Sequence, residues 1–343
     1  MQIRDRATRR PRMLWTAALV ALGVVLSGCA SNAPQDTLKP EGPFSRKIDD
    51  LFQWPFWIAV AIFFIVEGLI VYALFRFRHR GDDDDAEPKQ IHGNTRLEIT
   101  LTALPFMILL GLAFPTVGTL FDLSEKPKGD SITVDVIGHQ WWWEYRYHGS
   151  NVVTATELHI PVGKPVYLRL FSADVIHAYW IPKLNGKRDV IPGRLQTLKV
   201  QADEPGVYLG QCTEFCGASH ANMRNRAIAE TPAEFERWLT AQQQKAATPG
   251  DGTSASTGLG LFNTKGCAGC HAVKGVSQGR VGPDLTHLMD RTTFAGGIFR
   301  MTTENLAAWL RNPPGEKPGS IMPNLKLSED EIAHLVAYLE TLK

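Results

Sequence analysis

The chain has 343 residues, a formal net charge of +1 and five cysteines. Its length predicts two or three domains. The near-zero net charge supplies no basic field of the kind that attracts nucleic acid, so we expect no nucleic-acid partner. An odd number of cysteines indicates that they are not all paired in disulfides.

Residues 1–28 have the pattern of a secretory signal peptide. Five arginines between positions 4 and 12 precede an apolar run from Leu14 to Leu26. The run ends in Leu-Ser-Gly-Cys29, which resembles the lipobox of bacterial lipoproteins, and cleavage there would leave Cys29 as a lipid anchor. The alternative is an ordinary signal or anchor helix with an incidental cysteine. In either case we expect the mature N-terminus outside the cytoplasm.

Residues 29–122 contain two long apolar segments, at about 54–75 and 99–121. Each can cross a bilayer, which takes ~20 residues. The basic residues of the connection between them, from Arg76 to Arg96, place that connection in the cytoplasm. The segments therefore predict a transmembrane hairpin with both ends outside. Glu67 lies within the first segment, where an acid is costly unless it faces a partner or water.

Residues 123–240 change to short β-type runs. Residues 131–137, 165–171 and 195–200 alternate apolar and polar side chains, and turn residues separate them. Many short strands of this kind predict an antiparallel sandwich or barrel. Within this region the three consecutive tryptophans 141–143 cannot all face one core, because strand side chains alternate between faces. We expect one or two of them near the surface or a partner.

The segment from Cys212 to Met223 combines two thiols, an imidazole and a thioether. Soft sulfur ligands together with imidazole suit copper, and two thiolates could bridge two copper ions. His177 is the obvious donor of a second imidazole. The alternative is a disulfide between Cys212 and Cys216 in a domain outside the cytoplasm.

A second motif follows a stretch of low apolar content. Residues 241–256 are rich in Gly, Ser and Gln and predict a flexible linker. In the domain 257–343, Cys267-Ala-Gly-Cys270-His271 has the attachment pattern of c-type haem, although such a pattern also occurs in redox and zinc sites. Met322 is the candidate sixth iron ligand, and a His/Met pair raises the haem potential. Its competitors, Met289 and Met301, lack the Met-Pro setting.

Three further stretches accompany the segment 212–223, namely Asp174–His177, Gly186–Arg194 and Gly206–Cys212. Together they resemble subunit II of the haem-copper cytochrome c oxidases, over about residues 45–240. Residues 256–343 resemble a small class I cytochrome c domain. The first resemblance implies a cupredoxin fold with a binuclear CuA centre. Its implied copper ligands are His177, Cys212, Cys216, His220, Met223 and the backbone carbonyl of Glu214.

The resemblance also implies roles beyond the copper ligands. The Glu214 side chain would help to hold a magnesium ion at the boundary with subunit I, while Asp189 and Arg194 would serve that boundary. Trp141 would be the point where electrons arrive from cytochrome c; the alternative is core packing with a subunit contact. Glu98 would lie at the mouth of a proton path, unless it is only an acid favoured at a helix N-terminus.

We therefore expect a multidomain chain: a two-helix transmembrane hairpin, an all-β cupredoxin-like sandwich and a small all-α cytochrome c domain. The resemblance implies subunit II of a bacterial terminal cytochrome c oxidase in the cytoplasmic membrane, with both soluble domains on the periplasmic side. Electrons from its own haem c, an external cytochrome c or a quinol-oxidising complex would pass through CuA to subunit I, which reduces oxygen and pumps protons. The alternatives are the CuA subunit of a nitric oxide reductase and a membrane-tethered electron carrier without an oxidase partner.

Overall fold

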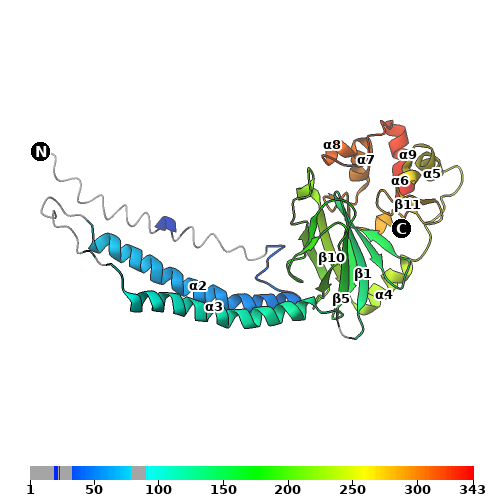
Figure 1. The fold of residues 1–343 in the computed structure, drawn as a ribbon. Helices are drawn as coiled ribbons and strands as arrows, with labels where there is room; N and C mark the ends of the chain where they lie inside the picture. Colours follow the sequence, from blue (N-terminus) through cyan, green and yellow to red (C-terminus); the bar gives the residue numbers. More distant parts are fainter. Residues whose placement is uncertain (1–18, 22, 24–32, 79–89, 91, 128) are drawn as a thin grey trace, which may run out of the picture.

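The computed structural model describes residues 33–78, 92–127 and 129–343, together with 19–21, 23 and 90. Cys29 and most of the predicted signal peptide lie outside the described residues. Figure 1 shows a long helical hairpin, a domain of strands and a helical domain at the C-terminus. We call the second the β domain (residues 129–241) and the third the C-terminal domain (residues 254–343). This order confirms the predicted multidomain fold class.

The hairpin consists of α2 (Pro43–Arg76) and α3 (Thr95–Ser124). Both helices are long and apolar enough to cross a membrane, and their apolar side chains are largely exposed along the hairpin. Apolar side chains in contact with lipid suit a helix whose backbone groups are all bonded internally. Both helices extend beyond the predicted segments, because polar turns continue them at the ends.

The end of the hairpin that contains the start of α2 is fixed to the β domain. The Glu41 amide donates to the Lys183 carbonyl at 2.9 Å, and the Asp203 amide donates to the Glu41 carbonyl at 3.1 Å. At Gly42, a Cβ atom would lie 2.2 Å from the Gln201 carbonyl oxygen. The first turn of α2 therefore approaches the β domain so closely that only glycine fits there.

The β domain contains a five-stranded sheet in the order β3-β2-β1-β5-β8 and a three-stranded sheet in the order β4-β10-β9. The pairs β1–β5 and β4–β10 are parallel, so the sheets are mixed rather than purely antiparallel as the strand pattern predicted. The alternation of side chains cannot distinguish these two pairings. The strands are β1 (Ile132–His139), β2 (Trp142–Tyr147), β3 (Val153–Ala155), β4 (Glu157–Pro161), β5 (Val166–Ser172), β6 (His177–Tyr179), β7 (Arg188–Val190), β8 (Gln196–Val200), β9 (Gly206–Gln211) and β10 (Arg224–Glu230).

The core of the β domain is built by the alternation that the sequence predicted. Val134 and Val136 of β1 and Leu168 and Leu170 of β5 are fully buried, while their neighbours along each strand are partly exposed. The helix α4 (Pro232–Ala241) starts with a capping box and buries Phe235 against this core.

The C-terminal domain packs its first helix against its last. The helices are α5 (Ser254–Thr264), α6 (Cys267–Cys270), α7 (Thr303–Arg311), α8 (Pro313–Glu316) and α9 (Glu329–Leu339). At their crossing, a Cβ atom on Gly258 would lie 2.0 Å from the His334 carbonyl oxygen, so glycine allows α5 and α9 to touch. Short two-residue strands form two hairpins: β11 (Ala272–Val273) with β12 (Ser277–Gln278), and β13 (Thr293–Phe294) with β14 (Phe299–Arg300).

The segment predicted as a linker makes specific contacts at its start. The Gln242 side chain is buried and donates to the Asp290 carboxylate at 3.0 Å, and His287 Nε2 lies 3.3 Å from the Gln244 carbonyl. The helix α5 begins at Ser254, three residues before the predicted start of the domain. The connection is thus packed against the C-terminal domain at its beginning.

Candidate metal and haem sites

The candidate copper ligands come from one strand and one closed loop. His177 opens β6, whereas Cys212 follows β9 and Met223 precedes β10. Because β9 and β10 pair antiparallel, the two ends of the loop meet, and the Cys212 amide donates to the Met223 carbonyl at 2.9 Å. The β domain therefore holds the loop at both ends, as a site built on a rigid scaffold requires.

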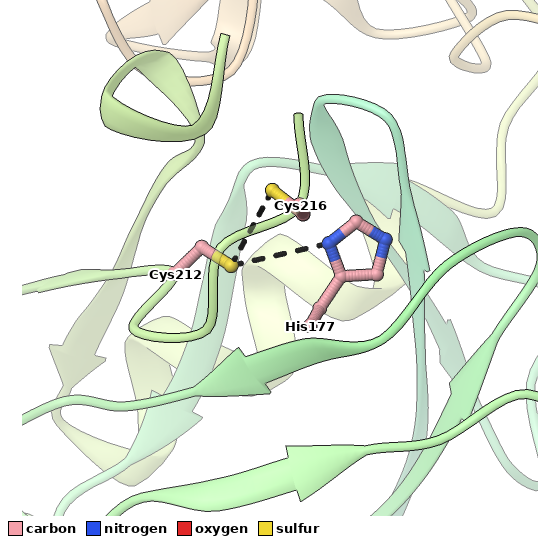
Figure 2. A group of neighbouring side chains, drawn as sticks. All are labelled: His177, Cys212 and Cys216. Carbon is pink, nitrogen blue, oxygen red and sulfur yellow. Dashed lines mark hydrogen bonds between the residues drawn. The ribbon is translucent and has the colours of Figure 1, made fainter. Parts of the chain in front are cut away.

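The two thiols and the two imidazoles lie close together, and Figure 2 shows the thiols with the first imidazole, that of His177. The Sγ atoms of Cys212 and Cys216 are 3.8 Å apart, far beyond a disulfide bond. His177 Nδ1 lies 3.9 Å from Cys212 Sγ. His220 Nδ1 lies 3.5 Å from Cys216 Sγ. Among the described residues, His177, Cys212 and Cys216 form the one group of three or more such ligands with metal-binding spacing.

The two weaker ligands complete the arrangement. Met223 Sδ lies 3.9 Å from Cys216 Sγ, and the Glu214 carbonyl oxygen lies 3.3 Å from Cys212 Sγ. The structure thus brings together all six predicted copper ligands. Two thiolates, two imidazoles, a thioether and a carbonyl form a soft donor set that fits copper.

Burial and hydrogen bonding prepare this site for a cation. His177 and Met223 are fully buried, and both cysteines are 3% exposed. The two thiols share a hydrogen bond, which lowers the pKa of Cys212 and raises that of Cys216. The shared hydrogen bond therefore favours the thiolate at Cys212, and a second thiolate beside it is disfavoured by the first.

Asp174 supports His177 and was missed at the sequence level. Its Oδ1 lies 2.8 Å from His177 Nε2, and Oδ2 accepts the Gln140 amide at 2.6 Å. An Nε2–H donated to this carboxylate leaves the Nδ1 lone pair facing the thiols. The sequence pattern that could have indicated this role is a carboxylate three residues before a candidate metal ligand.

The three tryptophans take three different environments. Trp143 is fully buried in the core, and Trp142 is partly exposed and stacks on His139 with ring centroids 4.3 Å apart. Trp141 is 8% exposed, and its Nε1 donates to the Cys216 carbonyl at 3.0 Å. Its neighbour Gln140 donates to the same carbonyl at 2.7 Å. The alternation argument was therefore right that the three cannot share one core.

The haem motif lines an apolar cavity. Cys267, Cys270 and His271 face it from α6 and the residue after it. His271 Nδ1 lies 2.8 Å from the Pro283 carbonyl, so an Nδ1–H bond leaves Nε2 free to bind iron. Burial lowers the pKa of His271, which favours the neutral imidazole that a metal needs. Gly282 backs the ring so closely that a Cβ atom there would lie 2.5 Å from His271 Cε1.

Met322 lines the same cavity, whereas neither Met289 nor Met301 is among its lining residues. The Trp309 indole Nε1 lies 3.2 Å from Met322 Sδ and orients the thioether. This placement favours Met322 over its two competitors.

Arg291 is a cavity residue that the motif search missed. Its guanidinium is buried and donates to the Asp284 carbonyl at 2.5 Å, and burial lowers its pKa. Its Nε has no hydrogen-bond partner among the described residues. A buried cation with a free donor fits a cavity ligand that carries carboxylates, as haem does.

The acidic side chains predicted to have further roles, on the hairpin and in the copper loop (residues 212–223), are exposed. Glu98 accepts the Asn94 amide at 3.2 Å, and Asn94 in turn caps α3. This capping accounts for the residue locally, and the proton-path role stays a prediction. Glu67 is exposed on α2, where it can face a partner. The Glu214 side chain is exposed. Among the described residues it belongs to no group of three or more side chains with metal-binding spacing, so the magnesium site also stays a prediction.

Comparisons with known proteins agree with this arrangement. The family described as cytochrome c oxidase subunit II, transmembrane domain, matches residues 37–118, and the periplasmic domain of the same subunit matches residues 150–229. The cytochrome c family matches residues 255–343. Together the three matches cover most of the hairpin, most of the β domain and nearly all of the C-terminal domain.

Curated relatives match this chain over two thirds to nearly all of its length. Cytochrome c oxidase subunit 2 of Alkalihalophilus pseudofirmus is 36% identical over 341 residues, covering 96% of this chain and 98% of the relative. The protein of the same name from Bacillus subtilis is 34% identical, covering 97% and 98%. Quinol oxidase subunit 2 of Bacillus anthracis is 33% identical, covering 67% of this chain and 80% of the relative.

Proposed function

Since the chain belongs to the cytochrome c oxidase subunit 2 family and ends in a cytochrome c domain, we propose that it is the subunit through which electrons enter an oxidase complex. The hairpin anchors it in the membrane. Both soluble domains would lie on the periplasmic side. Subunit I of the same complex would reduce oxygen to water and pump protons.

One observation carries this proposal: Trp141 belongs to both candidate sites. Its indole donates to the carbonyl of the candidate copper ligand Cys216, and the same residue is among those that line the haem cavity of the C-terminal domain. A single aromatic residue therefore bridges the haem cavity and the copper loop. This supports transfer of electrons from the C-terminal domain to the β domain within one chain.

Two separate sets of residues would hold the copper pair and the haem. His177, Cys212, Cys216, His220, Met223 and the Glu214 carbonyl would hold a copper pair, and Cys267, Cys270, His271 and Met322 would hold haem c. When bound, these two groups supply reversible one-electron chemistry. Asp174 and Pro283 fix the imidazole orientations, so little reorganisation is needed when the charge changes. Burial of His177, both cysteines and Met223 would limit the access of water to the copper site.

Further partners follow from the same proposal. The donor to the C-terminal domain would be a cytochrome c or a quinol-oxidising complex. Glu98 would serve a proton path into subunit I, and Glu214 would share a magnesium ion with that subunit. Cys29 would carry a lipid that adds a second anchor.

The test is an electron paramagnetic resonance spectrum of the oxidised full chain after loading with copper. Hyperfine structure from one electron shared by two copper ions is the expected result, and Cys216→Ser should abolish it. A mononuclear signal, or a Cys212–Cys216 disulfide without copper, would contradict the proposal. Consumption of oxygen rather than nitric oxide by the purified complex separates an oxidase from a nitric oxide reductase.

A further inference from the structure

The C-terminal domain is joined to the β domain by buried polar contacts as well as by the connecting segment. Figure 1 shows the two domains side by side. The Arg224 amide donates to the Gly296 carbonyl at 2.8 Å, and the Ser219 hydroxyl donates to the Pro318 carbonyl at 2.5 Å. Tethering alone raises the local concentration of a partner but sets no orientation. These contacts do set an orientation.

The first buried contact centres on Glu157 of β4. This side chain is 0% exposed, and its carboxylate accepts the amides of Thr292 and Thr293 at 3.0 and 2.9 Å. Both threonine hydroxyls also donate to it, at 2.5 and 2.8 Å. Arg226 Nε lies 4.0 Å away on the neighbouring strand. The C-terminal domain therefore supplies nearly all the hydrogen bonds of a buried carboxylate on the β domain.

The second buried contact centres on Lys317 of the C-terminal domain. Its Nζ donates to the Trp141 carbonyl at 2.6 Å and to the Ala295 carbonyl at 2.7 Å. The side chain is 4% exposed, and burial lowers its pKa to about 7. Burying an amine costs free energy unless its N–H groups have hydrogen-bond acceptors, so Lys317 needs an acceptor at this junction. The carbonyl of Trp141 supplies one.

Two glycine turns bring the domains this close. Gly296 and Gly319 have positive φ values of 77° and 80°. A Cβ atom at Gly296 would lie 2.5 Å from the Trp141 carbonyl oxygen, and one at Gly319 would lie 2.6 Å from the Trp141 ring. The backbone of the C-terminal domain therefore packs directly on Trp141.

We propose that Glu157 and Lys317 are positioning residues that form a two-point clamp, which holds the C-terminal domain over Trp141 in one orientation. The functional consequence rests on the proposed electron route: the clamp presets the path from the haem cavity to the copper loop. It also covers Trp141, which leaves the C-terminal domain as the place where an external donor delivers electrons.

The clamp is tested first without any electron transfer. Hydrogen–deuterium exchange is measured on the full, cofactor-loaded chain in detergent, for peptides that contain Arg224, Thr292 and Thr293. Glu157→Gln should speed exchange of the Thr292 and Thr293 amides by at least ~10-fold, because their hydrogen bonds lose a charged acceptor. The Arg224 amide donates to Gly296 and not to Glu157, so faster exchange there would report that the domains have separated. Lys317→Met should speed exchange at Arg224. Glu329→Gln is the control, since that carboxylate is exposed and pairs with Arg311 within the C-terminal domain.

The same variants then test the functional consequence. After photoreduction of the haem, Glu157→Gln should transfer electrons to copper about tenfold more slowly while the haem midpoint potential stays unchanged. A variant that merely loosened the fold would shift that potential. If Glu157→Gln fails to fold, Thr292→Val removes a single donor and should show the same direction of change.

Each outcome decides a separate claim. Unchanged exchange at all three amides in both clamp variants would overturn the clamp, as would equal acceleration throughout the C-terminal domain. Absence of haem-to-copper transfer in the parent chain would instead overturn the proposed electron route, and the exchange result would still stand.

Discussion

The indole Nε1 of Trp141 donates to the Cys216 carbonyl at 3.0 Å, while the carbonyl of the same Trp141 accepts the Lys317 amine at 2.6 Å. One residue thus contacts the copper loop through its side chain and the C-terminal domain through its backbone. The ring is almost fully buried between the two domains. Hydrogen-bonded contact of this kind fixes the distance between two centres more firmly than apolar packing alone.

Replacing Trp141 by Phe keeps an aromatic ring but removes the hydrogen bond to Cys216. We expect haem-to-copper electron transfer to slow about tenfold, equivalent to ~1.4 kcal/mol in activation free energy. Flash photoreduction of the loaded chain measures the rate. Trp238→Phe is the control, because Trp238 stacks on His159 and is not among the residues that line the haem cavity. Equal rates in the parent chain and Trp141→Phe would rule out the role.

Asp174→Asn weakens the partner of His177 without changing the shape of the site. The asparagine side chain can still accept a hydrogen bond from the Gln140 backbone amide. It no longer carries the negative charge that supports the imidazole of His177. Loss of such a supporting group lowers metal affinity by about 10–100-fold. A copper competition titration measures the change. Asp130→Asn should leave affinity unaltered, since Asp130 is exposed and pairs with Lys164.

Gly282→Ala and Gly269→Ala form a matched pair at the haem motif. A methyl at position 282 would lie 2.5 Å from His271 Cε1, whereas a Cβ atom at position 269 meets nothing within 4 Å. We expect Gly282→Ala to displace the imidazole and lower the yield of six-coordinate haem. Visible spectra of the purified chains report this. Similar spectra for both variants would show that Gly282 does not position His271.

Met322→His changes the sixth ligand to a second imidazole. A thioether ligand raises the haem potential relative to imidazole, so we expect the midpoint potential to fall by on the order of 100 mV or more within the ~0.8 V range that axial ligands span. Spectroelectrochemical titration measures it. Met289→Leu is the control, because Met289 does not line the cavity. A larger shift in Met289→Leu would reverse the assignment.

Glu144 makes the β domain sensitive to acid. Burial alone would raise its pKa, but hydrogen bonds with His139 and Arg146 outweigh burial and hold the pKa below its ordinary value of 4.5. The folded pKa is thus below the unfolded one, so this stabilisation is present above pH 4.5 and is lost as pH falls through the folded pKa. Urea midpoints across pH 3–6 should decline less steeply for Glu144→Gln than for the parent chain. Parallel curves would refute the linkage.

Several features followed from the sequence because they depend on local spacing. The cysteine-histidine motif around Cys267 and the sulfur-rich segment 212–223 are each confined to one loop or turn, so their ligands are close in space whatever the rest of the fold does. Long apolar runs likewise predict membrane helices from composition alone. The hairpin and the domain order are confirmed.

Other features depend on residues far apart in the chain, and only the tertiary structure decided them. The parallel pairing of β1 with β5 does not change the alternation of either strand, so the pattern could not reveal it. Glu157 and Thr292 lie 135 residues apart in the chain yet share hydrogen bonds, and Lys317 reaches Trp141 across 176 residues. Such contacts exist only once both domains have folded and packed. The sequence by itself determined which candidate metal-binding and haem-binding side chains the chain offers, because each motif is local. The packing of two domains decided how the two candidate sites face each other.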